Sequence, residues 1–211
     1  MKTDDLIGAM AQDGLGRRDV GRAMWLALLG GSAVAAAIFA ARIGFRPDIA
    51  VAATQPRFLL KFAVTVPLAV AAAALVMRIA RPGLAWRPWG LALAIAPLVL
   101  GAAVIGELLL LPESAWARAS IGTNAPHCLT IIPLLALGPL ACLLLALREG
   151  APTRPGLAGA VAGLAASGIG ASLYATNCTD DSPLFVATWY PLAIGIVVLL
   201  GFLGGRRLLR W

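Results

Sequence analysis

The sequence predicts an all-α membrane protein, a bundle of six transmembrane helices with its N-terminus and C-terminus in the cytoplasm. The first observation is composition, because 60% of the 211 residues are hydrophobic and only 13% are charged. Soluble domains are about half apolar and about a quarter charged. The second observation is that the apolar residues form long runs, and a transmembrane helix needs about 20 mostly apolar residues. Six runs qualify: 24–43, 60–80, 89–111, 128–147, 157–176 and 185–205.

These runs occupy most of the chain and divide it into three parts. Residues 24–205 form the predicted six-helix transmembrane domain, which leaves no room for a separate soluble domain. Residues 1–23 form a cytoplasmic N-terminal segment, and residues 206–211 form a basic cytoplasmic tail. We interpret the first run as a retained span because aspartates precede it and it exceeds the 7–15 apolar residues of a signal peptide.

The orientation follows from the positive residues, which cytoplasmic loops retain. Twelve of the 17 Lys and Arg residues lie in or beside the N-terminal segment, the second and fourth loops and the tail. This predicts that both termini face the cytoplasm and that loops 44–59, 112–127 and 177–184 face the periplasm. The protein is then a multi-pass protein of the bacterial inner membrane. Its net charge of +7 reflects topology and does not indicate direct contact with nucleic acid.

Residues inside the runs predict how the helices pack. Small residues recur at intervals of three or four in the fifth run, which lets a neighbouring helix approach closely: Gly159, Gly163, Ser167 and Gly170. Prolines inside several runs predict kinks, because neighbouring helices can satisfy the carbonyls that they free: Pro67, Pro97, Pro133, Pro139 and Pro191.

The start of the N-terminal segment has the pattern of a short amphipathic helix over residues 1–14. Thr3 can cap it, two aspartates suit the positive end of its dipole, and three apolar residues share one face: Asp4, Asp5, Leu6, Ile7 and Met10. Two interpretations remain open for this segment. It is an interfacial helix or a disordered lead-in, or it docks into the groove of a cytoplasmic protein.

The three cysteines differ in position. Cys142 lies among Leu and Ala in the fourth run and is a packing residue. Cys128 begins that run at its outer end and Cys178 lies in the last outer loop, so both face the compartment where disulfides persist. His127, Asp180 and Asp181 are their candidate supporting residues.

Four interpretations of the Cys128–Cys178 pair remain open. They are a structural disulfide, a thiol pair that responds to oxidants or metal, a catalytic thiol-exchange site and a permanent metal site. The lack of a Cys-x-x-Cys motif argues against the catalytic site.

Glu107 is the acidic residue inside a predicted span, near the outer end of the third run. A carboxylate inside a membrane is costly and is a functional candidate by default. It either supports the thiol pair, carries a transport function, or reaches the interface without a functional role.

Several stretches resemble one known family. They are Met-Lys-Thr-Asp-Asp-Leu-Ile at 1–7, Arg-Pro-Asp at 46–48, Gly-Ala-Pro-Thr-Arg-Pro at 150–155, Asn-Cys-Thr-Asp-Asp-Ser-Pro-Leu-Phe-Val-Ala-Thr-Trp-Tyr at 177–190 and Gly-Gly-Arg-Arg-Leu-Leu-Arg-Trp at 204–211. The 178–190 stretch is the most specific. Together they resemble the NrsF-type family of bacterial membrane anti-sigma factors, the negative regulators of sigma factor F.

The resemblance implies a transcription regulator without enzymatic activity or a cofactor. Such proteins hold an extracytoplasmic-function sigma factor at the inner membrane until stress releases it. Their two outward-facing cysteines, implicated in the response to metal stress, match Cys128 and Cys178, which are then sensing residues and transient metal ligands. The N-terminal segment is then the sigma-binding element, and we expect Asp4 and Asp5 to oppose a basic surface of the sigma factor.

Two other functions remain open from the sequence. A membrane thiol oxidoreductase would use the same cysteine pair and would show redox turnover. A small transporter would depend on Glu107, and Glu107→Gln would then abolish solute uptake.

Overall fold

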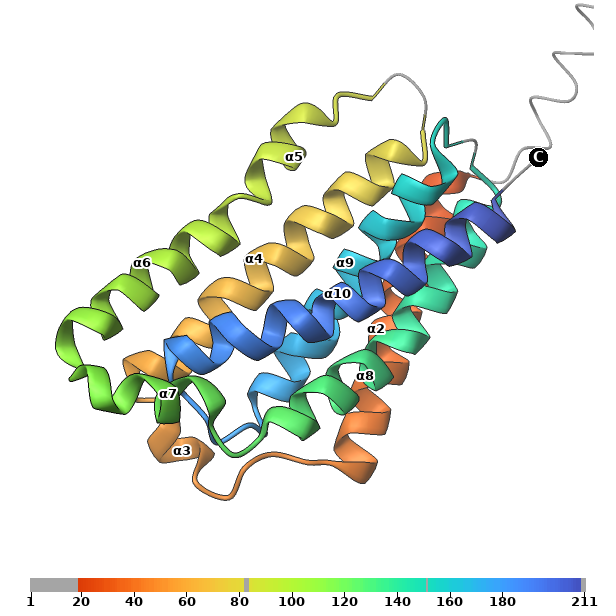
Figure 1. Cartoon of the computed structure of the whole chain (residues 1–211). Coiled ribbons are helices and arrows are strands. Elements are labelled where there is room, and N and C mark those ends of the chain that lie inside the picture. Colours follow the sequence, from red (N-terminus) through yellow and green to blue (C-terminus); the bar gives the residue numbers. More distant parts are fainter. Residues whose placement is uncertain (1–18, 82–83, 151, 210–211) are drawn as a thin grey trace, which may run out of the picture.

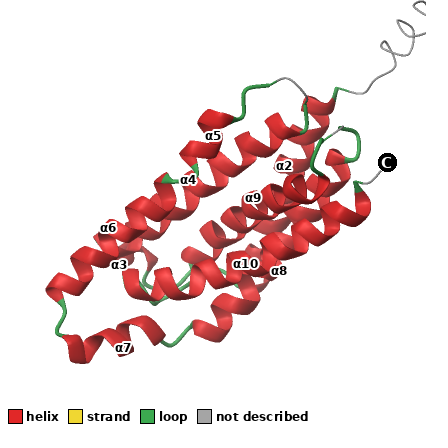
Figure 2. Cartoon of the chain, turned by 45° about the horizontal axis from the view of Figure 1, so that its top comes forward, coloured by secondary structure: helices red, strands yellow, loops and turns green. Residues whose placement is uncertain are grey.

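The computed structural model describes residues 19–81, 84–150 and 152–209. These residues are almost entirely helical, with short connections and no β-strand among them (Figure 2). In chain order the helices of Figure 1 are α2 (Val20–Arg42), α3 (Ile49–Ala52), α4 (Pro56–Ile79), α5 (Arg87–Ala92), α6 (Ile95–Leu110), α7 (Glu113–Ile121), α8 (Ala125–Leu147), α9 (Pro155–Ala175) and α10 (Pro183–Leu208).

The predicted all-α architecture with six span-length segments is confirmed. Within the described ranges, 6 helical segments are long and apolar enough to cross a membrane: Val20–Arg42, Pro56–Ile79, Arg87–Leu110, Glu113–Leu147, Pro155–Ala175 and Pro183–Leu208. Insertion into a membrane and the direction of the termini stay predictions.

The structure corrects two predicted loops. Helix α4 begins at Pro56, so residues 56–59 belong to a span and Lys61 lies in the second turn of the helix. Proline suits this first position because a backbone N–H there would have no acceptor within the helix, so nothing is lost when proline lacks one. The predicted loop 112–127 contains α7, a helix of 9 residues with Glu113 at the positive end of its dipole.

The third span is divided into α5 and α6 at residues 93–94. Pro97 explains the position of the break, because proline has no N–H to donate to the carbonyl four residues earlier, that of Leu93. The predicted kink in this run is therefore an interruption of the helix. Pro67, Pro139 and Pro191 lie within continuous helices.

The helices form one bundle with two chemically different ends (Figure 1). One end, which we call the terminal end, holds Asp19 and Leu209, the first and last residues that the structure describes. Leu209 packs there in one cluster with Met24, Ala80 and Leu147. Helices α3 and α7 and the α9–α10 connection lie at the other end, which we call the cysteine end. The described chain ends therefore share one side of the bundle.

Small residues allow α9 to occupy the centre of the bundle, where it is the most buried of the six spans. A Cβ atom added to Gly159 would collide with the carbonyl of Gly201 on α10, and one added to Gly163 would lie 2.6 Å from the Val197 carbonyl. A Cβ on Gly170 would lie 2.8 Å from the Ile132 carbonyl on α8. The close helix approach predicted for this run is thus present against two neighbouring helices, α10 and α8.

We expect Gly159→Ala to destabilise the bundle because the added methyl group has no space against α10. Overpacking of this kind costs about 1–3 kcal/mol. Thermal unfolding of the detergent-solubilised protein, followed by helical circular dichroism, measures the loss. Gly30→Ala is the matched control, since a Cβ there meets nothing within 4 Å. Equal stability of the two variants would contradict the close α9–α10 contact.

Candidate functional site

The fold brings Cys128 and Cys178 together. Cys128 lies in the first turn of α8, and Cys178 lies in the α9–α10 connection, residues 177–182, which we call the cysteine loop. Both are free thiols, both are at most 1% exposed, and their side chains are within hydrogen-bonding reach of each other. Cys142 is also free but lies further along α8 and is only half-buried. The two candidate sensing cysteines therefore form one buried pair.

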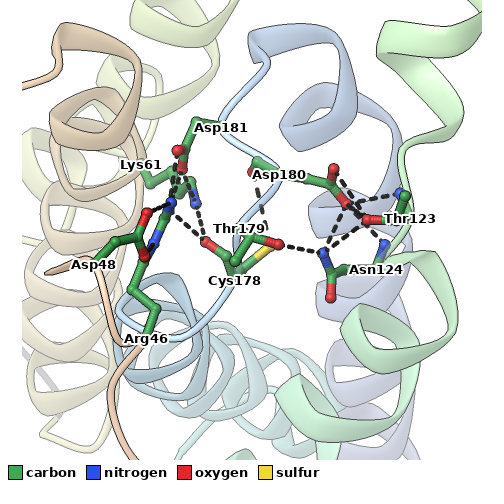
Figure 3. A network of polar contacts seen from close by, with 9 residues as sticks. All are labelled: Arg46, Asp48, Lys61, Thr123, Asn124, Cys178, Thr179, Asp180 and Asp181. Carbon is green, nitrogen blue, oxygen red and sulfur yellow. Dashed lines mark hydrogen bonds and ion pairs between the residues drawn. The ribbon is translucent and has the colours of Figure 1, made fainter. Parts of the chain in front are cut away.

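Two buried cations hold the backbone of the cysteine loop (Figure 3). Lys61 of α4, with 0% exposure, donates a hydrogen bond of 2.7 Å to the Cys178 carbonyl and pairs with the Asp181 carboxylate. Arg46, from the α2–α3 connection, donates Nη1 to the same carbonyl at 3.3 Å and to Asp181 Oδ2 at 2.9 Å. One carbonyl and one carboxylate of the loop thus anchor both cations.

Asp48 completes this cluster and makes it electrically neutral. It accepts hydrogen bonds of 2.7 Å from both Nε and Nη2 of Arg46. The bond to Asp48, followed by Asp181, raises the pKa of Arg46 above its usual value despite burial, and Arg46 lowers the pKa of Asp48. Buried charges are tolerated when they are paired and hydrogen-bonded. We call Arg46, Asp48, Lys61 and Asp181 the charge cluster.

Asp180 holds the other side of the loop to the start of α8 (Figure 3). Its Oδ2 accepts the backbone N–H groups of Thr123 at 2.8 Å and Asn124 at 2.7 Å, and the side-chain amide of Asn124 at 2.9 Å. These N–H groups lie at a helix start, where the helix dipole also favours a carboxylate. Burial works to raise the pKa of Asp180, but the hydrogen bonds from Asn124 and Thr123 outweigh it and lower that pKa.

The surroundings of Cys178 favour its thiolate. The hydrogen bond with Cys128, the positive charge of Lys61, a backbone hydrogen bond at Asp180 and a smaller effect of Tyr174 together outweigh burial. They lower the pKa of Cys178 from 9.0 to about 7. The thiolate is the reactive form of cysteine, so this lowered pKa favours thiol chemistry at Cys178 near neutral pH.

Two tyrosines are buried in the same cluster as the cysteine pair. Tyr174 of α9 and Tyr190 of α10 belong to the same buried cluster as both cysteines, and their ring centroids lie 6.4 Å apart. Their hydroxyl groups are buried and have no hydrogen-bond partner among the described residues. Because the thiols, tyrosines and Lys61 come from four helices and one loop, the state of the pair can influence the packing of all of them.

The other predicted supporting residues are placed differently. His127 is exposed although Cys128 beside it is buried, and no contact found in the described ranges joins its imidazole to the pair. Glu107, 6% exposed, pairs at 2.9 Å with Nη2 of Arg57 across α6 and α4. Residues 19–81, 84–150 and 152–209 contain no group of three or more His, Cys, Asp or Glu side chains arranged to hold a metal ion.

A cavity of about 260 Å³ between α4, α6 and α10 bears on the transporter alternative. Its lining is apolar apart from the hydroxyl-bearing Thr65 and Tyr190, and includes Leu68, Leu100 and Ile194. No charged side chain lines it, so Glu107 does not face a polar cavity there.

Asp4, Asp5, Leu6, Ile7 and Met10 of the predicted sigma-binding segment lie outside the described residues.

Sequence reasoning missed the charge cluster. Asp181 is predicted near the cysteines and Arg46 lies in a connection as predicted, but no sequence pattern assigns Lys61 and Arg46 to one buried site. One sequence signal was available: apart from Lys2, Lys61 is the sole lysine of a chain whose other basic residues are all arginine. A lysine retained near the start of an apolar run fits a pocket that takes a compact ammonium group.

We expect the reaction of Cys178 with a small permeant thiol reagent to accelerate with pH around a midpoint of about 7. The thiolate is depleted below that pH and nearly complete above it. Lys61→Met should raise the midpoint and slow the reaction at neutral pH by roughly tenfold, since one pKa unit is a tenfold change in thiolate fraction. Mass spectrometry of the Cys178 peptide measures the rate, with Arg57→Met as control. A midpoint near 9 in the parent protein would contradict this account.

Similarity to known proteins agrees with the family resemblance. The family model NrsF, described as negative regulator of sigma F, matches residues 10–211. The anti-sigma-F factor NrsF of Caulobacter vibrioides is 36% identical, and the probable anti-sigma-F factor NrsF of Azospira oryzae is 33% identical. Each alignment covers 100% of both chains. No solved structure is significantly similar to the chain. The chain therefore belongs to the NrsF family of negative regulators of sigma F.

Proposed function

We propose that this protein is an anti-sigma factor of the bacterial inner membrane. It binds an extracytoplasmic-function sigma factor at its cytoplasmic face and releases it when the periplasmic pair Cys128–Cys178 changes state. The observation that carries the regulatory role is similarity over 100% of the chain to two proteins named as anti-sigma-F factors.

The distribution of charge supports the proposed orientation. Described arginines are abundant at the terminal end, where acidic residues are few: Arg22, Arg78, Arg81, Arg87, Arg148, Arg154, Arg206 and Arg207. At the cysteine end, positive residues are balanced by Asp48, Glu107, Glu113, Asp180 and Asp181. An excess of Lys and Arg marks cytoplasmic loops. This distribution of charge supports the proposal that the terminal end is the cytoplasmic face and that the cysteine loop faces the periplasm.

The chemistry of the cysteine pair supports a sensing role. The Cys178 thiolate attacks a small disulfide, forming a mixed disulfide and expelling one thiolate. Cys128 then displaces the second thiolate, and the two protons of the original thiols pass to the expelled groups. The charge cluster holds the Cys178 carbonyl in the reduced state. Formation of the disulfide changes the position of Cys178 relative to α8, so it strains those contacts.

Residues 1–23 form the proposed sigma-binding element. Residues 20–23 of this segment already belong to α2, and Asp19, the N-cap of α2 and the first described residue, lies at the arginine-rich terminal end. In this proposal Leu6, Ile7 and Met10 fill an apolar groove, while Asp4 and Asp5 face a basic surface of the sigma factor.

Full-length protein in detergent is expected to capture sigma factor F of the same bacterium. Asp4→Lys with Asp5→Lys should weaken capture by about tenfold or more, because like charges across an interface are costly. Asp13→Lys is the control within the same segment. Capture that survives the double replacement would move the binding site to the inner loops near Arg78 and Arg148, and failure of the parent protein to bind would refute the anti-sigma role.

Replacing both Cys128 and Cys178 with Ser should preserve sigma-factor binding and abolish its release by a small disulfide. Binding is measured before and after oxidant treatment, with Cys142→Ser as the matched control that keeps the response. If the double replacement eliminated binding itself, the cysteines would be structural and not sensory.

The lowered pKa of Cys178 also fits a membrane thiol oxidoreductase. Repeated turnover of a disulfide with an added dithiol by the purified protein would support that function. The regulator is expected to react once per molecule.

A further inference from the structure

Helix α4 makes polar contacts at both ends of the bundle. At the cysteine end, Lys61 donates a hydrogen bond of 2.7 Å to the Cys178 carbonyl and is fully buried with Asp181. A buried ammonium group cannot leave these partners without a large desolvation cost. Helix α4 therefore either holds the Cys178 backbone in place or moves together with it.

At the terminal end, Arg81, the second residue after α4, contacts the start of α2. Arg81 Nη2 lies 3.3 Å from Asp19 Oδ1, and the same oxygen accepts the Gly21 N–H at 2.9 Å as the N-cap of α2. A Cβ atom on Gly21 would coincide with the Arg81 guanidinium. Arg81 thus fills a space that glycine alone leaves open, at the point where residues 1–18 join the bundle.

Between these ends α4 is tied to α9, which leads directly into the cysteine loop. The Ser172 hydroxyl donates to Thr65 Oγ1 at 3.0 Å, and a Cβ on Gly168 would lie 2.8 Å from the Ala69 Cα. The helix runs without a break from Pro56 to Ile79. A shift imposed at Lys61 is therefore carried along a continuous element that lies against the centre of the bundle.

The contact between α2 and α8 offers a second route between the two ends. A Cβ on Gly31 would lie 2.6 Å from the Pro139 Cα, which shows that these backbones are in close contact. Packing of the same kind also holds α4 against α9, so close contact alone does not distinguish the two routes. The Arg81–Asp19 pair is instead exposed, at 44% and 73%, and an exposed ion pair is weak enough to form and break. Discrete polar contacts of this kind favour α4 as the switching element.

We infer that α4 couples the cysteine loop to the base of the N-terminal segment, with Lys61 as the contact at one end and Arg81 as the contact at the other. A change at the thiol pair moves the Cys178 carbonyl, α4 responds through Lys61, and Arg81 changes its hold on the start of α2. This inference rests on the proposed function, because the segment that Arg81 controls is the proposed sigma-binding element.

Thermodynamic linkage provides the test. If oxidation of the pair lowers the affinity for sigma factor F by some factor, the bound sigma factor must shift the dithiol–disulfide equilibrium by the same factor. Full-length protein carrying Cys142→Ala is equilibrated in glutathione buffers with and without sigma factor F. Its disulfide content is measured after acid quenching and alkylation, and its affinity for the sigma factor is measured in both redox states. Glutathione disulfide gains the two electrons and two protons that the pair loses.

We expect a coupling factor of about 5–150-fold in the parent protein. Arg81→Met should reduce it to nearly 1, and it should shift the dithiol–disulfide equilibrium without sigma factor by at most about fivefold, because the exposed Arg81–Asp19 pair that it removes is weak. Arg87→Met, which removes another arginine of the terminal end, should keep the parent factor. Asp19→Asn breaks the same ion pair from its other side and decides the question if Arg81→Met does not fold.

Three outcomes would overturn the inference. In the first, Arg81→Met and Asp19→Asn both keep the coupling factor of the parent protein. In the second, Gly31→Ala alone removes the coupling, which would assign it to the α2–α8 contact. A parent protein that binds the sigma factor equally in both redox states would also refute it. Failure of the parent protein to bind sigma factor F at all is a separate result that removes the proposed function itself.

Discussion

The burial of the Lys61 ammonium group is the constraint on which the cysteine end depends. An unpaired charge at 0% exposure would destabilise the fold severely, so its partners must stay in place. Those partners are Asp181 and the Cys178 carbonyl, and the Phe58 ring adds its face, 5.5 Å from Nζ. Arg46 lies on the same ring, 5.8 Å from its centroid. The cysteine loop therefore has to remain closed over α4 while Lys61 is charged.

Closure of the loop in turn brings the two thiols together. Asp181 pairs with Lys61 of α4, and Asp180 accepts the Asn124 N–H at the start of α8. These neighbouring aspartates therefore attach the loop to two different helices (Figure 3). Cys178 lies before them in the loop, and Cys128 lies in the first turn of α8. The same carboxylates that fix the geometry also leave Cys178 near Lys61, which favours its thiolate. Structural and reactive roles are thus assigned to one loop.

The sequence predicts the spans because lipid demands long apolar runs, and it predicts close packing of α9 because its small residues recur on one face. It also identifies Asp180 and Asp181 as residues near the cysteines. The charge cluster could not be predicted, because its members come from α4 and two connections that are distant in sequence. Lys61 stands at the start of an apolar run, where a lysine ordinarily extends its ammonium group to the interface, so its burial is not expected from the sequence. His127 shows the reverse error, since adjacency to Cys128 in sequence does not place its exposed side chain beside the buried thiols.

Distance decides how the cysteine end can act on the terminal end. Helix α4 has 24 residues, and a rise of 1.5 Å per residue makes it about 36 Å long. One unit charge acting on another over about 36 Å, with an effective dielectric constant of about 20, contributes only about 0.5 kcal/mol before screening by salt. Regulation by coupling requires about 1–3 kcal/mol. Under the proposed function, a change in charge at the thiol pair would therefore be too weak to act directly on a sigma factor bound at the terminal end, and the signal would have to pass through the packing of the helices.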